Sequence, residues 1–265
     1  MENTSTPIKK NRGKEVLVII MVLTLVLVTL YWVAIQSFQL EGLPLYFMQL
    51  GLYLIYFLLA CWGLKQEQIS LPINTRRILE ALAWTLVGWL LFLLLIHLLG
   101  AVRLPEELQA LKNTPAWKIG AKILSTWFFV GMGEEVLFRG YFLKAFRRHF
   151  TSGTDRRRTV AAVLLVSAFF SLWHLPIRIS WLISGELDLA LLLVSHLVLF
   201  LLGIGYAYLY IRSDNILLTG LVHGVSNYPL VGVNSQMSAI ILVAAIGCVE
   251  ISRMITRRKA KALLQ

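Results

Sequence analysis

The sequence predicts an all-α, polytopic integral membrane protein, with about eight transmembrane helices and a buried polar active site. Composition is the first reason: 58% of the 265 residues are apolar, only 15% are charged and the mean hydropathy is +0.73. A soluble domain of this length carries more charge and fewer apolar residues. The second reason is that apolar runs of about 20 residues, the length a helix needs to cross a bilayer core, recur along the chain. We expect one transmembrane domain over residues 16–252, with basic tails at 1–15 and 253–265.

Each apolar run is taken as one span. The first run has no charged residue, and it is too long and lacks the small-residue cleavage site of a removed signal peptide. The fourth run contains two adjacent acids, and Thr114-Pro115 before it favours a helix start. The last two runs are short. In chain order, the expected spans are residues 16–35, 43–64, 78–99, 119–142, 160–175, 189–211, 216–233 and 238–251.

The distribution of Lys and Arg predicts the orientation. These residues concentrate in both tails and in the loops after the second, fourth and sixth spans, whereas residues 36–42 and 232–236 contain none. The positive-inside rule therefore places both termini in the cytoplasm, which agrees with an even number of spans. The loop at 100–118 weakens the pattern, because it holds three basic residues. Short loops and a Lys/Arg-rich tail favour a bacterial plasma membrane.

The formal net charge of +11 does not indicate nucleic-acid binding. The basic residues are spread over several loop ends, where they would contact anionic lipid. No basic stripe interleaved with aromatic residues is present, as a nucleic-acid-binding face would require. Membrane lipid is therefore an expected partner. Cys61 and Cys248 lie in different apolar spans without CxxC spacing, so we interpret both as small buried hydrophobic residues.

Glu134 and Glu135 are the most informative residues, because they alone among the 14 acidic residues lie well inside a predicted span. A carboxylate at membrane depth costs about 3 kcal/mol on insertion scales and is rare without a function. Arg139 follows Glu135 by four positions, which predicts an ion pair on one face of an α-helix. Glu134 is rotated by about 100° from Glu135, so it can face a cavity instead.

Polar residues in two later spans accompany the acidic pair. His174 lies in the fifth span, and His223 and Asn227 lie four positions apart in the seventh, on one helical face. At about 1.5 Å of rise per residue, Glu134 and His174 both lie roughly 20–25 Å from the basic hairpin end and can therefore be level.

Two smaller features of the late spans also carry expectations. Gly220 and Gly224 form a small-xxx-small step that would let the seventh span approach a neighbouring helix closely. His196 has no companion motif residue, and we expect it to make only a helix-to-helix hydrogen bond.

These residues form three motifs that resemble a known family. In order, Glu134-Glu135-x-x-x-Arg139, Phe170-x-x-x-His174 and His223-x-x-x-Asn227 resemble the motifs of the CAAX-protease and bacteriocin-processing family. These intramembrane proteases are also called the Abi family or type II CAAX prenyl endopeptidases. The resemblance covers roughly residues 115–235, and the three motifs together are specific although each is weak alone.

The resemblance implies an eight-helix fold that cuts peptide bonds within or at the membrane. Glu134 would be the base that activates water, and His174 would share that water. His223 and Asn227 would donate hydrogen bonds to the developing oxyanion. Glu135 and Arg139 would be the orienting, charge-balancing pair, with Phe170 as a supporting residue.

The sequence is compatible with hydrolysis with or without a metal ion. Glu134, His174 and His223 are chemically able to bind a divalent ion such as Zn, whereas the His-Glu-x-x-His arrangement of many zinc proteases is absent. We favour metal-free, glutamate-based hydrolysis, so no cofactor is required, with a divalent metal as the alternative.

The expected substrate is a membrane-associated peptide or protein tail. The resembled family includes enzymes that trim prenylated CAAX tails and bacterial members linked to peptide maturation or bacteriocin self-immunity. The alternatives are a non-catalytic membrane immunity or scaffold protein and a proton-coupled transporter. A transporter would be expected to show repeat symmetry or interrupted helices at corresponding positions, and the sequence shows neither.

Overall fold

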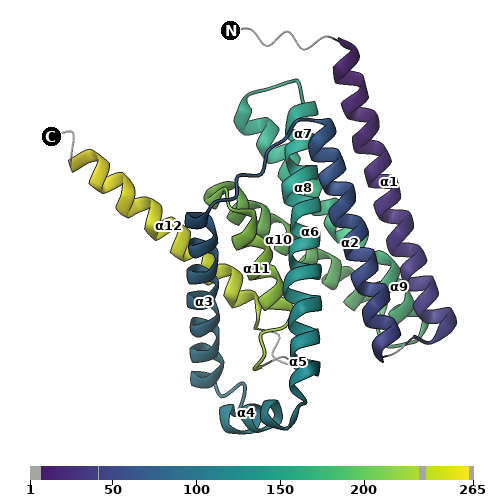
Figure 1. Cartoon of the computed structure of the whole chain (residues 1–265), viewed down its shortest axis with the longest axis vertical. Coiled ribbons are helices and arrows are strands. Elements are labelled where there is room, and N and C mark those ends of the chain that lie inside the picture. Colours follow the sequence, from purple (N-terminus) through teal and green to yellow (C-terminus); the bar gives the residue numbers. More distant parts are fainter. Residues whose placement is uncertain (1–6, 41, 233–236, 263–265) are drawn as a thin grey trace. The chain divides into compact units, whose positions relative to one another are not determined.

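The computed structural model describes residues 7–40, 42–232 and 237–262, and Figure 1 traces the chain. The chain is 85% helical, and the described part contains no strand, which confirms the all-α class. Four expected features lie partly outside the described residues: the uncharged loop at 232–236, the end of the seventh predicted span and the outer parts of the two basic tails.

Six helical stretches among the described residues are long and apolar enough to cross a membrane. They confirm the polytopic membrane class but not the expected count of about eight. The fourth and seventh predicted spans account for the difference. Residues 116–149 are helical but divided by changes of helix type, and Ile216–Asn227 has only 12 residues. The six stretches are Gly13–Phe38, Gly42–Gln66, Thr75–Leu98, Asp155–Ile183, Leu189–Ser213 and Ala239–Arg258.

The chain divides into two compact units. The first unit comprises residues 1–71 and 136–204, and the second comprises residues 72–135 and 205–265. Helix α10 (Leu189–Ser213) contributes residues to both. The predicted site residues are shared out between them: Glu134, Glu135, His223 and Asn227 belong to the second unit, and Arg139, Phe170 and His174 to the first.

The first unit has an aromatic core. Helix α1 packs against α2, α8 and α9, and α2 also packs against η2. Phe138 lies in the core and makes edge or tilted ring contacts with Phe169, Phe170 and Trp173, with centroids 5.1 to 5.8 Å apart. Besides the first part of α10, its elements are α1 (Pro7–Phe38), α2 (Gly42–Gln66), η2 (Val136–Phe142), α7 (Leu143–His149), α8 (Asp155–Trp173) and α9 (Leu175–Ile183).

The second unit is organised around α11, which packs against η1, α3 and α12. Pro115 is the N-cap of α5, so the helix start predicted at Thr114-Pro115 is confirmed. The loop expected at 100–118 contains a short helix, α4, that buries none of its residues. Besides the end of α10, the elements are α3 (Thr75–Leu98), α4 (Leu104–Asn113), α5 (Ala116–Ile123), η1 (Leu124–Met132), α6 (Gly133–Glu135), α11 (Ile216–Asn227) and α12 (Ala239–Ala262).

Glycines let α11 lie directly against η1, as the small-xxx-small step predicted. A Cβ atom on Gly131 would lie 2.7 Å from the backbone nitrogen of Gly224, and one on Gly224 would lie 2.8 Å from the carbonyl oxygen of Trp127. A Cβ on Gly220 would collide with Met132. Because the obstructing atoms at Gly131 and Gly224 are backbone atoms, no side-chain rotation can make room for a methyl group there.

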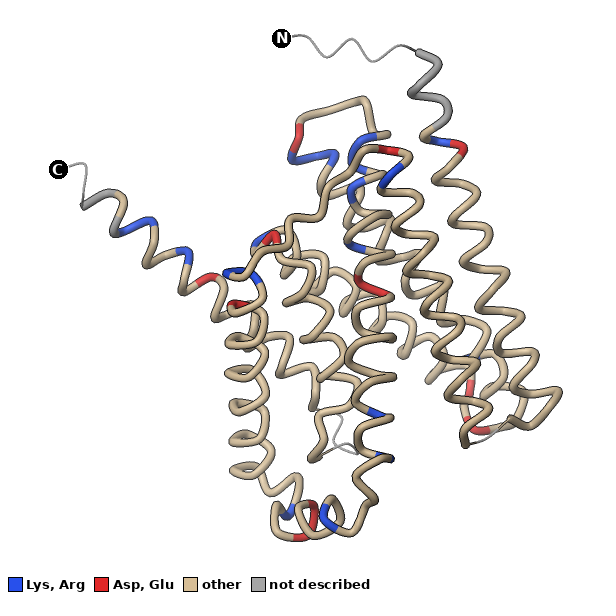
Figure 2. The backbone as a smooth tube through the Cα atoms, in the orientation of Figure 1, with Lys and Arg blue, Asp and Glu red and all other residues tan. Residues whose placement is uncertain are grey.

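Charged residues lie mainly near helix ends. Figure 2 shows long uncharged middle sections in α1, α2 and α3, with Lys and Arg gathered toward helix ends and connections. This pattern is typical of membrane helices, because charged side chains are stable in the headgroup region and costly in hydrocarbon. The cytoplasmic location of both termini stays a prediction.

Candidate active site

The acidic pair lies in an unusual stretch of helix. Glu134 and Glu135 belong to α6, a three-residue α-helical turn between the π-helical segments η1 and η2. Wide helical turns of this kind are rare and occur frequently at functional sites. The α-helical period assumed for Glu135 and Arg139 does not apply over residues 136–142. Their pairing therefore does not follow from their spacing and stays a prediction.

Both glutamates lie close to His223 of α11 within the second unit. The exposed fractions of Glu134, Glu135 and His223 are 2%, 0% and 4%. His223 Nδ1 is 2.8 Å from Glu135 Oε1, a hydrogen-bond distance, and His223 Nε2 is 3.7 Å from Glu134 Oε2. The two carboxylates thus face the two nitrogens of one imidazole ring.

The hydrogen bond to Glu135 fixes the protonation of one ring nitrogen. With Glu135 ionised, its carboxylate only accepts hydrogen bonds, so Nδ1 of His223 carries the proton that it donates to Glu135. Nε2 is then the atom directed toward Glu134, at a separation too long for a direct hydrogen bond. A separation of this kind is one that a water molecule can bridge.

Tyr206 covers one face of the same imidazole. Its ring stacks on that of His223 with centroids 4.6 Å apart and an interplanar angle of 25°. Tyr206 is 3% exposed and lies in the part of α10 that belongs to the second unit. Two contacts, one in the ring plane and one on its face, therefore hold the orientation of His223.

His174 of the first unit lies at a break between two helices. It ends α8 and begins α9, with φ −83° and ψ −4°, and Pro176 stands in the first turn of α9. Proline has no N–H to continue the α8 hydrogen-bond ladder, which explains the interruption. His174 Nδ1 is 2.9 Å from the Phe170 carbonyl oxygen. Since a carbonyl only accepts, Nδ1 donates, and in the neutral ring Nε2 carries the lone pair.

Arg139 and Phe170 pack together in the first unit. The Arg139 guanidinium carbon lies 4.6 Å from the Phe170 ring centroid, and its Nη2 donates a 3.1 Å hydrogen bond to the Gly203 carbonyl. Arg139 is fully buried. Phe170 also contacts the His174 ring, with centroids 4.8 Å apart, so Arg139, Phe170 and His174 form one contact group with the phenylalanine between the other two.

Asn227 is the only exposed residue among the seven predicted site residues, of which His174 is half-buried and the others are buried. It is the last residue of α11 and is exposed, whereas His223 one turn earlier is buried. A contribution of Asn227 to an oxyanion site stays a prediction.

Sequence reasoning missed two features of the second-unit cluster, which consists of Glu134, Glu135, His223 and Tyr206. Glu135 contacts His223, a partner not assigned to it from the motifs. Tyr206 had no signal as a site residue, because a tyrosine at that position also fits the membrane-interface pattern. The two adjacent acids did indicate a contact with another helix, because a carboxylate at membrane depth needs a polar partner and the two acids face different directions.

The described residues contain no group of three or more His, Cys, Asp or Glu side chains placed to hold a metal ion. Glu134 Oε2 and His223 Nε2, at 3.7 Å, are two donors that a zinc ion could bridge. Two donors do not make the closed or three-ligand zinc sites found in proteins. Metal-free hydrolysis stays a prediction, as does the alternative with a divalent ion.

Comparison with known proteins supports the resemblance. Residues 116–229 match the family model described as "Type II CAAX prenyl endopeptidase Rce1-like". This segment is Rce1-like. It contains all seven motif residues and confirms the predicted resemblance. No curated protein and no solved structure matches the chain.

The match and the six apolar helices indicate an integral membrane protein. The Rce1-like segment points to a membrane protease of the CAAX type. It begins at the start of α5 and ends two residues after α11, so it includes the elements that carry the second-unit cluster.

Proposed function

We propose that this chain is a membrane endopeptidase that hydrolyses peptide bonds in membrane-associated peptides or protein tails. The observation that supports this function best is the buried contact of His223 with both glutamates, within the Rce1-like segment. Buried carboxylates and a histidine held in one orientation are the groups that general acid–base hydrolysis requires. Glu134 is the water-activating base in this proposal.

The reaction needs one proton to move twice. The Glu134 carboxylate takes a proton from water as the water oxygen bonds to the scissile carbonyl carbon. The carbonyl oxygen becomes an oxyanion, which a hydrogen-bond donor stabilises by about 3 kcal/mol in other proteases. Glu134 then gives its proton to the amide nitrogen, the C–N bond breaks, and the products are a carboxyl group and an amine.

Glu135 acts through His223 in this mechanism. By accepting the Nδ1 hydrogen bond, the Glu135 carboxylate supports a doubly protonated ring, whose Nε2–H can donate to the oxyanion. Glu135 is therefore a positioning residue, and His223 is the group that touches the reacting atoms. The charge-balancing pair with Arg139 that the resemblance implied stays a prediction beside this role.

His174 is proposed to accept a hydrogen bond from the attacking water. Its Nδ1 donates to the Phe170 carbonyl, so Nε2 is an acceptor in the neutral ring, as a partner of activated water must be. Arg139, stacked on Phe170, would stabilise the helix turn that holds this histidine.

The test uses purified full-length protein in bilayer nanodiscs, incubated with synthetic membrane peptides that include CAAX-type tails, with products identified by mass spectrometry. Glu134→Gln should lower the cleavage rate by at least about 100-fold, because the amide cannot take a proton. Glu106→Gln, an exposed acid on α4, is the matched control and should cleave at the parent rate.

Two outcomes would contradict the proposal. Cleavage at the parent rate by a folded Glu134→Gln protein would exclude Glu134 as the base. Loss of parent activity with a chelator, restored by added zinc, would replace glutamate-based hydrolysis by a metal-dependent reaction.

A further inference from the structure

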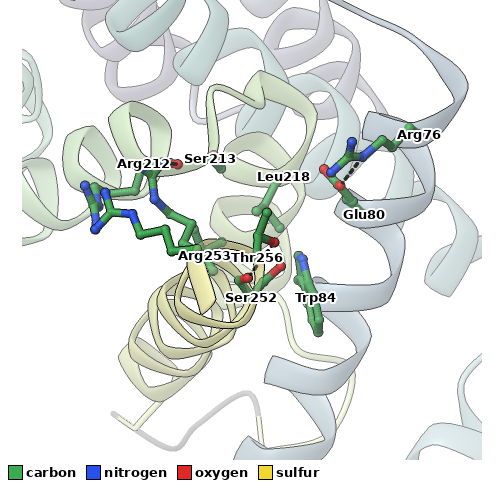
Figure 3. A pocket seen from close by; sticks show the side chains of 11 residues that line it. Arg76, Glu80, Trp84, Arg212, Ser213, Leu218, Ser252, Arg253 and Thr256 are labelled. Atoms are coloured by element: carbon green, nitrogen blue, oxygen red, sulfur yellow. Dashed lines mark hydrogen bonds and ion pairs between the residues drawn. The ribbon is translucent and has the colours of Figure 1, made fainter. Parts of the chain in front are cut away.

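A polar pocket lies in the second unit and shares no lining residue with the second-unit cluster. It encloses about 310 Å³ between α3, α10, α11 and α12, and Figure 3 looks into it. Four arginines from three helices line it: Arg76 of α3, Arg212 of α10, and Arg253 and Arg257 of α12. The mechanism proposed above uses none of them.

Nearby acids neutralise only part of this positive charge. Arg76 pairs with Glu80 at 2.8 Å, and Arg212 pairs with Glu250 through two hydrogen bonds. Glu250 also lies within electrostatic range of Arg253. Four guanidinium groups thus face two carboxylates, which leaves an excess of two positive charges at the pocket.

Arg253 has a donor atom with no partner. Its Nη1 donates to the main-chain carbonyl oxygen of Arg212, so the Arg253 side chain reaches the end of α10, and Figure 3 shows both arginines at the pocket. Its Nε is buried and makes no hydrogen bond within the described part of the chain. A buried N–H without a partner costs free energy, so an acceptor from outside the chain would stabilise this arrangement.

The pocket lies where membrane helices end. Arg76 is in the first turn of α3, Arg212 is in the last turn of α10, and Arg257 is near the end of the apolar stretch Ala239–Arg258. Trp84, two turns further into α3, also lines it, with the hydroxyl-bearing Ser252. Tryptophan favours the membrane interface, and a basic pocket between helices at that level suits an anionic lipid headgroup.

We propose that this pocket binds the phosphate group of an anionic membrane lipid. Arg253 and Arg257 donate to the phosphate oxygens in the forked geometry that guanidinium groups adopt with phosphate. Trp84 contacts the glycerol and upper acyl region, which distinguishes a lipid from free phosphate. Four helices line the pocket, so a bound lipid connects the ends of α3 and α12 with those of α10 and α11.

The experiment measures lipid binding by the full-length protein in phosphatidylcholine nanodiscs with increasing fractions of phosphatidylglycerol. Retained lipid is counted by native mass spectrometry after extraction in mild detergent. The parent should retain phosphatidylglycerol, and Arg253→Gln/Arg257→Gln should bind it about 25-fold more weakly, since each basic residue at an anionic surface contributes roughly fivefold. The matched control is Arg156→Gln/Arg157→Gln, which removes the same charge from exposed positions in α8.

The single variant Arg257→Gln is a second pocket variant that should fold like the parent, because Arg257 is exposed. It should weaken phosphatidylglycerol binding about fivefold without changing the melting temperature in detergent. If the Arg156→Gln/Arg157→Gln control weakens phosphatidylglycerol binding equally, diffuse surface charge holds the lipid and the pocket is not its binding site. If millimolar inorganic phosphate or glycerol phosphate competes fully, the lipid is not the ligand of the pocket. If the parent and the pocket variants retain equal amounts of phosphatidylglycerol, the pocket is not a lipid-binding site at all.

Discussion

The orientation of His223 depends on two residues that lie far from it in the sequence. Glu135 of α6 accepts a hydrogen bond from Nδ1, and Tyr206 of α10 stacks on the ring face. An imidazole confined in this way needs little reorganisation during a reaction, which is a large part of how enzymes stabilise transition states. The two contacts differ in kind, so substitutions can separate charge from packing.

The charge of Glu135 is tested by Glu135→Gln. Glutamine keeps an oxygen that can accept the Nδ1 hydrogen bond but no longer stabilises a doubly protonated His223. We expect the kcat for peptide cleavage to fall by about 100-fold while KM stays near the parent value, because the substrate still binds. A role for Glu135 in folding alone would instead lower the melting temperature and leave kcat of the folded fraction unchanged.

The face contact is tested by Tyr206→Phe and Tyr206→Leu. Phenylalanine preserves the stacked ring, whereas leucine removes an aromatic contact that contributes about 0.5–1.5 kcal/mol. We expect Tyr206→Leu to lower kcat about 2- to 10-fold relative to Tyr206→Phe. Equal kcat values for the two variants would show that stacking does not position His223.

At the scale of elements, α11 and η1 approach so closely that their glycine backbones touch. Gly131, Gly220 and Gly224 leave no room for a side chain at the crossing. Glu134 and Glu135 follow η1 directly, and His223 lies beside Gly224 on α11. The spacing of these two helices therefore sets the distance between the carboxylates and the imidazole.

Gly224→Ala tests this crossing. Its methyl group would meet the backbone of Thr126 and Trp127, and such overpacking costs about 1–3 kcal/mol. We expect a lower melting temperature in detergent and a loss of peptide cleavage, because His223 moves away from the glutamates. Gly247→Ala is the matched control: it lies in α12 with nothing within 4 Å of the added Cβ and should keep parent activity. Parent stability in both variants would show that the crossing tolerates separation.

The sequence predicts the elements better than their internal geometry. Apolar runs locate six spans, because the bilayer sets a length that composition alone reveals. The small-xxx-small step locates the crossing of α11 because only glycine allows such contact. The π-helical turns around Glu134 leave no mark on hydrophobic spacing, so the sequence alone predicts an α-helical period there. The Pro176 break at His174 did have a local signal.

The sequence identifies the residues of the candidate site better than it identifies which of them are in contact. Motif spacing singled out His223 and both glutamates, since polar residues at membrane depth are rare. The contact of Glu135 with His223 was not predictable, because spacing along one helix carries no information about which imidazole of another helix lies beside it. Buried Glu67, just after α2, was also missed, and it accepts a 3.0 Å hydrogen bond from the Tyr141 hydroxyl.

At the scale of the whole molecule, charge placement predicts which side of the membrane each connection faces. Arginines cluster in the last turn of α7 and the first turn of α8, on either side of their connection, and α4 belongs to a less basic loop. Single cysteines test this orientation after Cys61→Ser and Cys248→Ser remove the native thiols. A membrane-impermeant thiol reagent should label Arg156→Cys only in inside-out vesicles and Gln109→Cys only in intact cells.

The same reagent tests how substrate and water reach the acidic pair. We expect access from the cytoplasmic side, where a short apolar peptide can enter from the membrane plane while polar side chains satisfy its backbone groups. Leu217 and Leu221 lie on successive turns of α11 before His223, and both are half-buried. Leu217→Cys and Leu221→Cys should therefore be labelled in inside-out vesicles, and a competing membrane peptide should slow labelling at Leu221→Cys more. Labelling of both only in intact cells would reverse the orientation and the substrate route together, because water would then reach His223 from the opposite face.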